Sequence, residues 1–269
     1  MTSPSQDPQT QPLATVDGTP QARPPRTPWS FVDVFAGLGA VLLLSILIAA
    51  PIQFSQVRDN DALLVLSTLP VWIGLLGTTI WASRRHGTGN LVVDLALRFR
   101  PVDLAIGLGA GLGLRFVIGL WTLIYTHVTG QQPTGNLEPI LGGGLGTGFW
   151  LVVNMTAIAV VGPVIEEIFF RGLGLRSALA STLRRAGSPR FADPRSRARW
   201  SILATSAVFA LLHLSEVSDW TSAVVLLPGL FLAGWVLGRL TIATGRLGPA
   251  IVTHVVFNAV AVAALLALT

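Results

Sequence analysis

The chain contains no cysteine and no lysine among its 269 residues. The lack of cysteine excludes a disulfide framework, a thiolate metal site and a cysteine nucleophile. Charged residues are also scarce, at 12% of the sequence, whereas hydrophobic residues make up 51% and the mean hydropathy is +0.65. This balance excludes an ordinary soluble domain of this length and indicates a membrane protein.

The apolar residues gather into runs of about 20 residues, which is the length that a helix needs to cross roughly 30 Å of hydrocarbon. Backbone groups in lipid must bond within their own segment, and the runs show no alternation, so helices are favoured over a barrel. We therefore predict an all-α polytopic transmembrane helical bundle. Seven spans are expected, at about 31–54, 62–82, 102–127, 146–180, 200–214, 220–242 and 247–268. A break in the fourth span at Gly162-Pro163 would raise the number to eight.

The first 28 residues are rich in Pro, Gln and Thr and hold too little apolar surface to offset the cost of ordering. We expect residues 1–28 to form a disordered cytoplasmic tail and residues 29–269 to form a single transmembrane helical domain. The opening segment is too long and too polar for that of a signal peptide, so the first span is expected to remain as an anchor.

All eighteen basic residues are arginines, and the net charge is +5. They gather at every second connection between predicted spans, while the intervening connections hold only Arg58. By the positive-inside rule, this pattern predicts a cytoplasmic amino terminus. We expect an integral membrane protein of the bacterial plasma membrane. Because the arginines form no single amphipathic surface, no nucleic-acid partner is expected.

Polar side chains interrupt three of the predicted spans at helical spacing. The first group, in the fourth span, is Glu166-Glu167 with Arg171. Glu167 and Arg171 lie on one helical face, where a guanidinium can hold a carboxylate ionised and oriented. Glu166 points about 100° away and remains free to act as a general base. The alternative interpretation is that the three residues mark a helix end near the headgroups, with all three side chains solvated.

The other two groups each contain a histidine. Phe209 and His213 lie four residues apart in the fifth span, and His254 and Asn258 lie four apart in the seventh. A single membrane histidine is often only an interhelical hydrogen-bonding group. At a rise of about 1.5 Å per residue, however, the three helices place their polar groups at overlapping depths in the cytoplasmic half of the bilayer. Since polar groups are costly there, we predict one shared functional site.

The three motifs and their order resemble those of the CPBP intramembrane proteases. They are Glu-Glu-x3-Arg at 166–171, Phe-x3-His at 209–213 and His-x3-Asn at 254–258. This family, also called Abi, includes CAAX prenyl endopeptidases and bacteriocin-processing or bacteriocin-immunity proteins. The run 231–254 also resembles the family's approach to its last motif, and the resemblance covers a protease-like core at about 98–262.

The resemblance implies an intramembrane endopeptidase that hydrolyses a peptide bond of a membrane-associated protein or peptide. Glu166 and His213 would hold and activate the attacking water. His254 and Asn258 would then stabilise the oxyanion.

Three further residues of these motifs are expected to support that chemistry. Glu167 and Arg171 look like orienting groups, and Phe209 is expected to pack beside the catalytic water. For Phe209 we favour the alternative interpretation of simple core packing.

A metal is the open question for this site. Glu166, His213 and His254 could bind zinc with one coordination position left open. A glutamate mechanism without metal needs the same residues. Because no acceptor that would fix the tautomer of either imidazole stands out in the sequence, we favour a site without a tightly bound metal.

Two other functions remain open at this stage. One is a non-proteolytic bacteriocin-immunity or binding protein of the same family, and the other is a Glu/His-based transporter. The expected partners are the lipid bilayer and, for the protease, a membrane-associated peptide or protein substrate.

Three features outside the motifs also carry expectations. Arg115 falls in the middle of the third span and should face the bundle, where it could pair with a carboxylate. The glycines of that span are expected to allow close helix packing; they are Gly107, Gly109, Gly111 and Gly113. Tryptophans at the ends of apolar runs are expected to be interfacial anchors; they are Trp29, Trp150, Trp200 and Trp220.

Overall fold

The computed structural model describes residues 13–14, 20–21, 29–49, 60–133, 148–217 and 219–267. The helices are α1 (Phe31–Leu44), η2 (Ser45–Ala49), α3 (Asn60–His86), α4 (Leu91–Asp94), α5 (Pro101–Thr129), α7 (Gly148–Thr156), η3 (Ala157–Val161), α8 (Gly162–Glu167), η4 (Ile168–Gly174), α9 (Leu175–Arg184), η5 (Pro189–Phe191), α10 (Pro194–Leu212), η6 (His213–Glu216), α11 (Trp220–Thr244) and α12 (Gly248–Leu266). The strands β1 (Leu13–Ala14) and β2 (Pro20–Gln21) form one short antiparallel pair.

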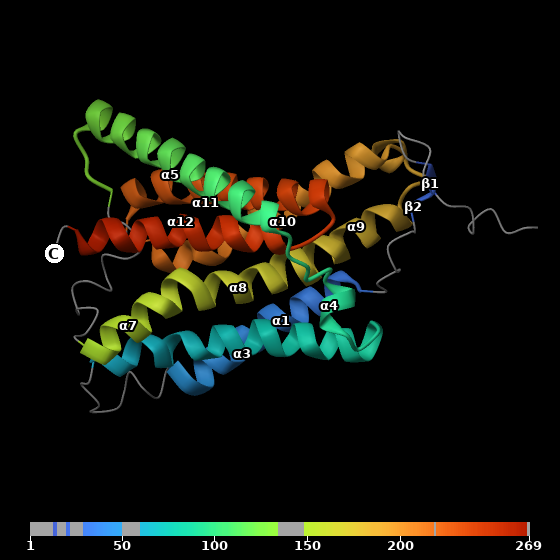
Figure 1. Ribbon diagram of the computed structural model, residues 1–269, viewed down its shortest axis with the longest axis horizontal. Helices are drawn as coiled ribbons and strands as arrows, with labels where there is room; N and C mark the ends of the chain where they lie inside the picture. Colours follow the sequence, from blue (N-terminus) through green and yellow to red (C-terminus); the bar gives the residue numbers. More distant parts are fainter. Residues whose placement is uncertain are drawn as a thin grey trace, which may run out of the picture.

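The prediction of an all-α membrane bundle is confirmed, and each of the seven predicted spans coincides with a helix (Figure 1). Within the described residues, five helical segments are long and apolar enough to cross a membrane: Phe31–Ile48, Pro101–Thr129, Gly148–Arg184, Pro194–Glu216 and Trp220–Thr244. A shorter apolar helix covers Gly248–Ala264. The α3 helix, which corresponds to the second predicted span, packs along α1.

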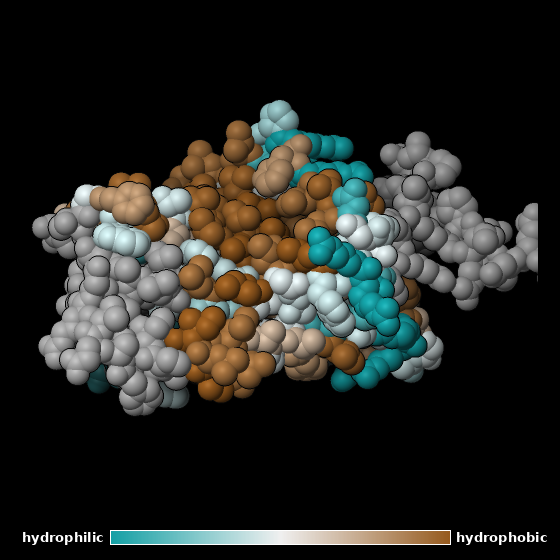
Figure 2. Space-filling model, turned by 90° about the horizontal axis from the view of Figure 1, so that it is seen from below, coloured by the Kyte–Doolittle hydropathy of each residue, from teal (hydrophilic) through white to brown (hydrophobic). Residues whose placement is uncertain are grey.

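The surface of the bundle is apolar where a lipid bilayer would surround it. Figure 2 shows a central hydrophobic region, with hydrophilic residues gathered toward the end of the molecule where α4 and the end of α9 lie in Figure 1. On α5, an exposed row of large apolar side chains recurs every four residues: Leu104, Leu108, Leu112 and Phe116. Such a row on a soluble protein would expose far more apolar surface than water tolerates, so it indicates contact with lipid.

The fourth predicted span is one long helical run from Gly148 to Arg184, and it passes through Gly162-Pro163 without a break. The alternative of an eighth span at this point is therefore not realised. A π-helical stretch, η3, comes directly before the proline, and the Gly162 amide donates to the carbonyl of Ala157. The wider π turn accommodates the missing N–H and the ring of Pro163, which would disrupt a regular α-helical turn.

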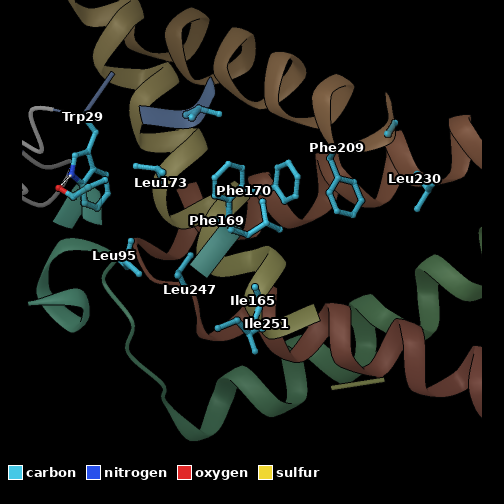
Figure 3. Packing of buried hydrophobic residues seen from close by; sticks show 14 residues of the cluster. Trp29, Leu95, Ile165, Phe169, Phe170, Leu173, Phe209, Leu230, Leu247 and Ile251 are labelled. Atoms are coloured by element: carbon cyan, nitrogen blue, oxygen red, sulfur yellow. Dashed lines mark hydrogen bonds between the residues drawn. The ribbon is translucent and has the colours of Figure 1, made fainter. Parts of the chain in front are cut away.

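The long helix lies between two groups of helices, with α1 and α3 on one side and α5, α10, α11 and α12 on the other (Figure 1). The main cluster of buried apolar side chains occupies the space between them. Phe169 and Phe170 of η4 pack there with Phe209 of α10 and Ile251 of α12 (Figure 3). This cluster is the apolar wall against which the polar groups of the fourth span are buried.

Close packing of α5 on α12 depends on two of the four glycines. A Cβ atom at Gly111 would lie 2.8 Å from the Val256 side chain and 2.9 Å from the Thr253 carbonyl, and one at Gly107 would overlap Val252. By contrast, Gly109 and Gly113 face open space. The packing role that we predict is therefore confirmed for one face of the glycine row, and this contact fixes the position of α12 against α5.

Ion pairs hold the polar ends of the helices. At the beginning of α12, Arg246 Nε donates to Asp103 Oδ2 at 3.0 Å, which ties the α11–α12 turn to the first turn of α5. Between α1 and α3, His86 Nδ1 lies 2.8 Å from Asp33 Oδ1. Together with the glycine contact, the first pair sets the height of α12 and hence that of His254.

The structure corrects one of the tryptophan expectations. Trp29 is fully buried, and its indole N–H donates to the Ala82 carbonyl at 3.2 Å, so it is a core residue that joins α1 to α3. Trp200 and Trp220 are exposed as an interfacial anchor should be, and Trp150 is partly exposed. Apart from β1 and β2, residues 1–28 lie outside the described residues, and the disordered tail remains a prediction.

We predict that Gly111→Ala destabilises the protein by about 1–3 kcal/mol, because the new methyl group forces α5 away from α12. The measurement is thermal unfolding of the purified protein in detergent. Gly113→Ala is the matched control in the same helix. It meets open space, and alanine is the better helix former, so its midpoint should equal or exceed that of the wild type. Equal losses for both variants would contradict the packing account.

Candidate active site

The predicted site residues come from three parts of the chain. Glu166 and Glu167 end α8, and Arg171 follows in the π-helical stretch η4. Phe209 lies in the last turn of α10 and His213 begins the 3-10 turn η6. His254 and Asn258 lie in α12.

Glu167 is the centre of the site. Its side chain is fully buried, and its Oε1 accepts from Arg171 Nη1 at 2.8 Å and from His254 Nδ1 at 2.9 Å. An ionised carboxylate can only accept, so the imidazole donates its Nδ1–H. The alternative of three solvated groups at a helix end is therefore wrong, because Arg171 is buried together with Glu167.

Arg171 joins further elements to the same point. Its Nη2 donates to the Gly234 carbonyl of α11 at 3.2 Å, and its guanidinium carbon lies 4.6 Å from the centre of the Phe209 ring. A buried guanidinium is costly unless its donors are satisfied and its charge is paired. Glu167, the Gly234 carbonyl and the face of Phe209 together meet this requirement.

His254 stands between the two neighbouring glutamates. Its Nδ1 is held by Glu167, and its Nε2 lies 3.8 Å from Glu166 Oε2. The Glu166 side chain keeps 23% of its surface exposed, whereas Glu167 has none. As the spacing predicts, one carboxylate is fixed and the other is accessible. The distance of 3.8 Å is too long for a direct hydrogen bond.

His213 approaches the same region through Phe209. Its Nδ1 lies 2.7 Å from the Phe209 carbonyl, so it donates there and leaves Nε2 as the free acceptor. The Phe209 ring contacts both imidazoles, with centroid distances of 4.7 Å to His213 and 5.8 Å to His254. The carboxylate within 4 Å of His213 is that of Glu216, at 3.9 Å, and not that of Glu166.

Asn258 lies one turn beyond His254, and its Nδ2 donates to the Ile158 carbonyl of η3 at 3.1 Å. This contact occupies one amide N–H. Beside it, Arg115 Nε donates to the Phe257 carbonyl at 2.5 Å, and its guanidinium lies 3.8 Å above the Phe257 ring. Arg115 therefore faces the bundle, as expected, but its described partners are a carbonyl and an aromatic ring and not a carboxylate.

The geometry does not assemble the metal ligands that the sequence suggests. Among the described residues, no group of three His, Asp or Glu side chains is placed so that it could hold a metal ion. The Phe209 ring lies against both imidazoles, and within the described residues His213 and Glu166 form no ion pair within 4 Å. The argument that neither imidazole has a partner to fix its tautomer is wrong, since Glu167 and the Phe209 carbonyl fix both.

Some partners of the site could not be seen in the sequence. The carbonyls of Gly234, Ile158 and Phe209 accept from Arg171, Asn258 and His213, and a backbone carbonyl carries no sequence signal. Phe170 packs edge-on against Phe209 at 5.1 Å (Figure 3). Its position directly before Arg171 is the signal that could have included it.

Comparison with known protein families gives one match. Residues 148–260 match the family described as type II CAAX prenyl endopeptidase Rce1-like. This range ends near the predicted limit of the protease-like core at 262 but begins at α7, so it does not include the third predicted span. Neither the curated proteins nor the solved structures yielded a match for the chain.

The matched range contains the whole Glu167-centred cluster, and the members of the Rce1-like family are intramembrane endopeptidases. Its helices are apolar enough to cross a bilayer, as an integral membrane protein requires. Residues 148–260 thus form an Rce1-like domain, and this match supports the resemblance of the three motifs to the CPBP intramembrane proteases.

Proposed function

We propose that this protein is a glutamate-dependent endopeptidase that cuts a membrane-associated protein or peptide at the site formed by Glu166 and His254. The observation that carries the proposal is the position of His254 between two carboxylates. Glu167 holds its Nδ1 at 2.9 Å, and Glu166 lies 3.8 Å from its Nε2. This arrangement gives one oriented imidazole and one accessible base at the same place.

The separation of Glu166 and His254 suits a shared water molecule. A water that hydrogen-bonds to both atoms at about 2.8 Å fits a separation of 3.8 Å. Glu166 would remove a proton from this water as its oxygen attacks the peptide carbonyl carbon. The proton then passes to the leaving nitrogen as the C–N bond breaks, which regenerates the carboxylate.

Two groups are available to stabilise the developing oxyanion. Glu167 holds the Nδ1 side of His254, so the Nε2 edge of the imidazole faces the reaction site and would donate to the oxyanion when it carries a proton. Asn258 has a second amide N–H beyond the one that it donates to the Ile158 carbonyl. Both lie on α12, one turn apart, so one rigid helix would present both donors.

We assign His213 a role in holding the attacking water. Donation of its Nδ1–H to the Phe209 carbonyl leaves Nε2 as an acceptor for a water hydrogen. Phe209 is buried and contacts both imidazoles, so its ring would form the apolar wall beside this water. A dry wall on one side strengthens the electrostatic interactions of the site.

We also propose that the site opens toward the cytoplasm and that the amino terminus is cytoplasmic. The support is the arginine pattern together with the position of His254. His254 follows the first residue of α12 by six positions, or about 9 Å along the helix, and Arg246 lies just before that helix. The positive-inside rule places this end of the bundle on the cytoplasmic side.

Replacing Glu166 with Gln should reduce cleavage at least about 100-fold, because the amide cannot accept the proton of the attacking water. The measurement is membrane proteomics of cells that carry the wild type, Glu166→Gln or no copy of the chain, with uncut substrate expected to accumulate in the last two. Asp193→Asn, which keeps an N-capping side chain on α10, is the control and should match the wild type. A binding protein would instead show the same profile for Glu166→Gln as for the wild type.

Replacing Glu167 with Gln should cost about 3–5 kcal/mol of stability, because it leaves the Arg171 charge buried without its counter-ion. Glu166→Gln should change stability by less than about 0.5 kcal/mol, since that side chain is partly exposed. Thermal unfolding in detergent measures both. The double variant Glu167→Leu with Arg171→Met should recover much of the stability but none of the activity. If the two glutamine variants proved equally stable, the buried pair would not have the role assigned to it.

A further inference from the structure

The outer face of α3 carries a groove that the proposed protease chemistry does not use. Gly77, Ile80, Trp81, Arg84 and Arg85 line it, and its volume is about 310 Å³. These positions recur at helical spacing and therefore lie on one face of the helix. Trp81 is 47% exposed, and both arginines are exposed. The groove is open to whatever surrounds the protein at this end of α3.

The polarity along this face changes in one direction. Ile73, one turn before Gly77, is an exposed apolar side chain, and nothing lies within 4 Å of where a Cβ of Gly77 would be. Trp81 follows and then the two arginines. From Ile73 to Arg85 the helix rises about 18 Å, close to the thickness of one leaflet's acyl region. A surface that is apolar, then aromatic, then cationic complements a phospholipid, from its acyl chains through its glycerol backbone to its phosphate.

The aromatic part of the groove is held in place from behind. The His86 ring packs edge-on against Trp81 at 5.4 Å, and its Nδ1 is paired with Asp33 at 2.8 Å. Ser83, in the last turn of α3, donates its Oγ–H to Asp94 at 2.6 Å, and this bond holds α4 against the same end of α3. Trp81 therefore stands on a braced helix end.

The arginines of the groove are available to a ligand. In the part of the chain that the structure describes, neither Arg84 nor Arg85 makes a hydrogen bond or ion pair through its guanidinium. Exposed valines of α4, Val92 and Val93, lie beyond the same end of α3 and suit contact with the membrane surface. Two unpaired guanidiniums above an apolar notch complement a negatively charged headgroup on an acyl chain.

We propose that this groove binds an anionic phospholipid, with Arg84 and Arg85 on the phosphate, Trp81 at the level of the glycerol backbone and an acyl chain along Gly77 and Ile73. A guanidinium binds phosphate oxygens through two parallel hydrogen bonds. In a zwitterionic lipid, the ammonium group of the headgroup repels the arginines and offsets part of this attraction. The lipid is thus selected by charge at the rim and seated by the apolar surface below it. The site stands independently of the proposed peptidase activity.

The test is native mass spectrometry of the full chain in detergent, titrated with phosphatidylglycerol or with phosphatidylcholine of the same acyl composition. Phosphatidylglycerol should bind more tightly. Arg84→Gln with Arg85→Gln should weaken its binding about tenfold to thirtyfold. Arg184→Gln with Arg185→Gln is the matched control, since it removes the same two charges from the end of α9 and should leave the affinity unchanged.

Two further measurements distinguish the effect of charge from that of the guanidinium group, and binding of a lipid from binding of free phosphate. Arg84→Lys with Arg85→Lys retains the charge and should bind within a few fold of the wild type, which covers the case in which the glutamine variant fails to fold. Millimolar inorganic phosphate should not displace the lipid, because phosphate alone lacks the apolar part. Equal losses in the two glutamine variants, equal binding of both lipids, or displacement by inorganic phosphate would each overturn the proposal.

Discussion

The carboxylate of Glu167 is the group on which the architecture of the site depends. A fully buried carboxylate is tolerable only when it is paired and hydrogen-bonded, and here Arg171 and His254 both donate to it. Arg171 in turn reaches the Gly234 carbonyl and the Phe209 ring. One ionic group thus brings η4, α10, α11 and α12 together. The direction in which His254 presents its Nε2 follows from this network.

The helix that carries the glutamates is irregular on both sides of them. Two π-helical stretches, η3 and η4, flank the short α8 segment. A π turn leaves backbone groups that regular hydrogen bonding does not satisfy, and such turns are frequent at functional sites. Asn258 donates to the Ile158 carbonyl within η3, so the last motif supports the local geometry of the first. The irregular backbone and the polar side chains are parts of one arrangement.

Much of this could be predicted from the sequence because it depends on local periodicity. The apolar runs gave the seven long helical segments but not the short helices α4 and η5, and the four-residue spacing gave the Glu167–Arg171 pair. The histidine that lies beside Glu166 could not be predicted in this way. Whether His213 or His254 stands beside it depends on how the helices slide against each other, and that is set by contacts such as Gly111 on Val256. Partners that are backbone carbonyls leave no sequence signal at all.

The tautomer of His254 tests the central claim most directly. The chain has four histidines, so solid-state nitrogen NMR of histidine-labelled protein in lipid bilayers gives an assignable spectrum. Donation to Glu167 predicts that Nδ1 of His254 carries a proton and that Glu167→Gln shifts this signal while leaving those of His86 and His127 in place. An Nδ1 of His254 without a proton in the wild type would contradict the account, because the imidazole would then not be held by the buried carboxylate.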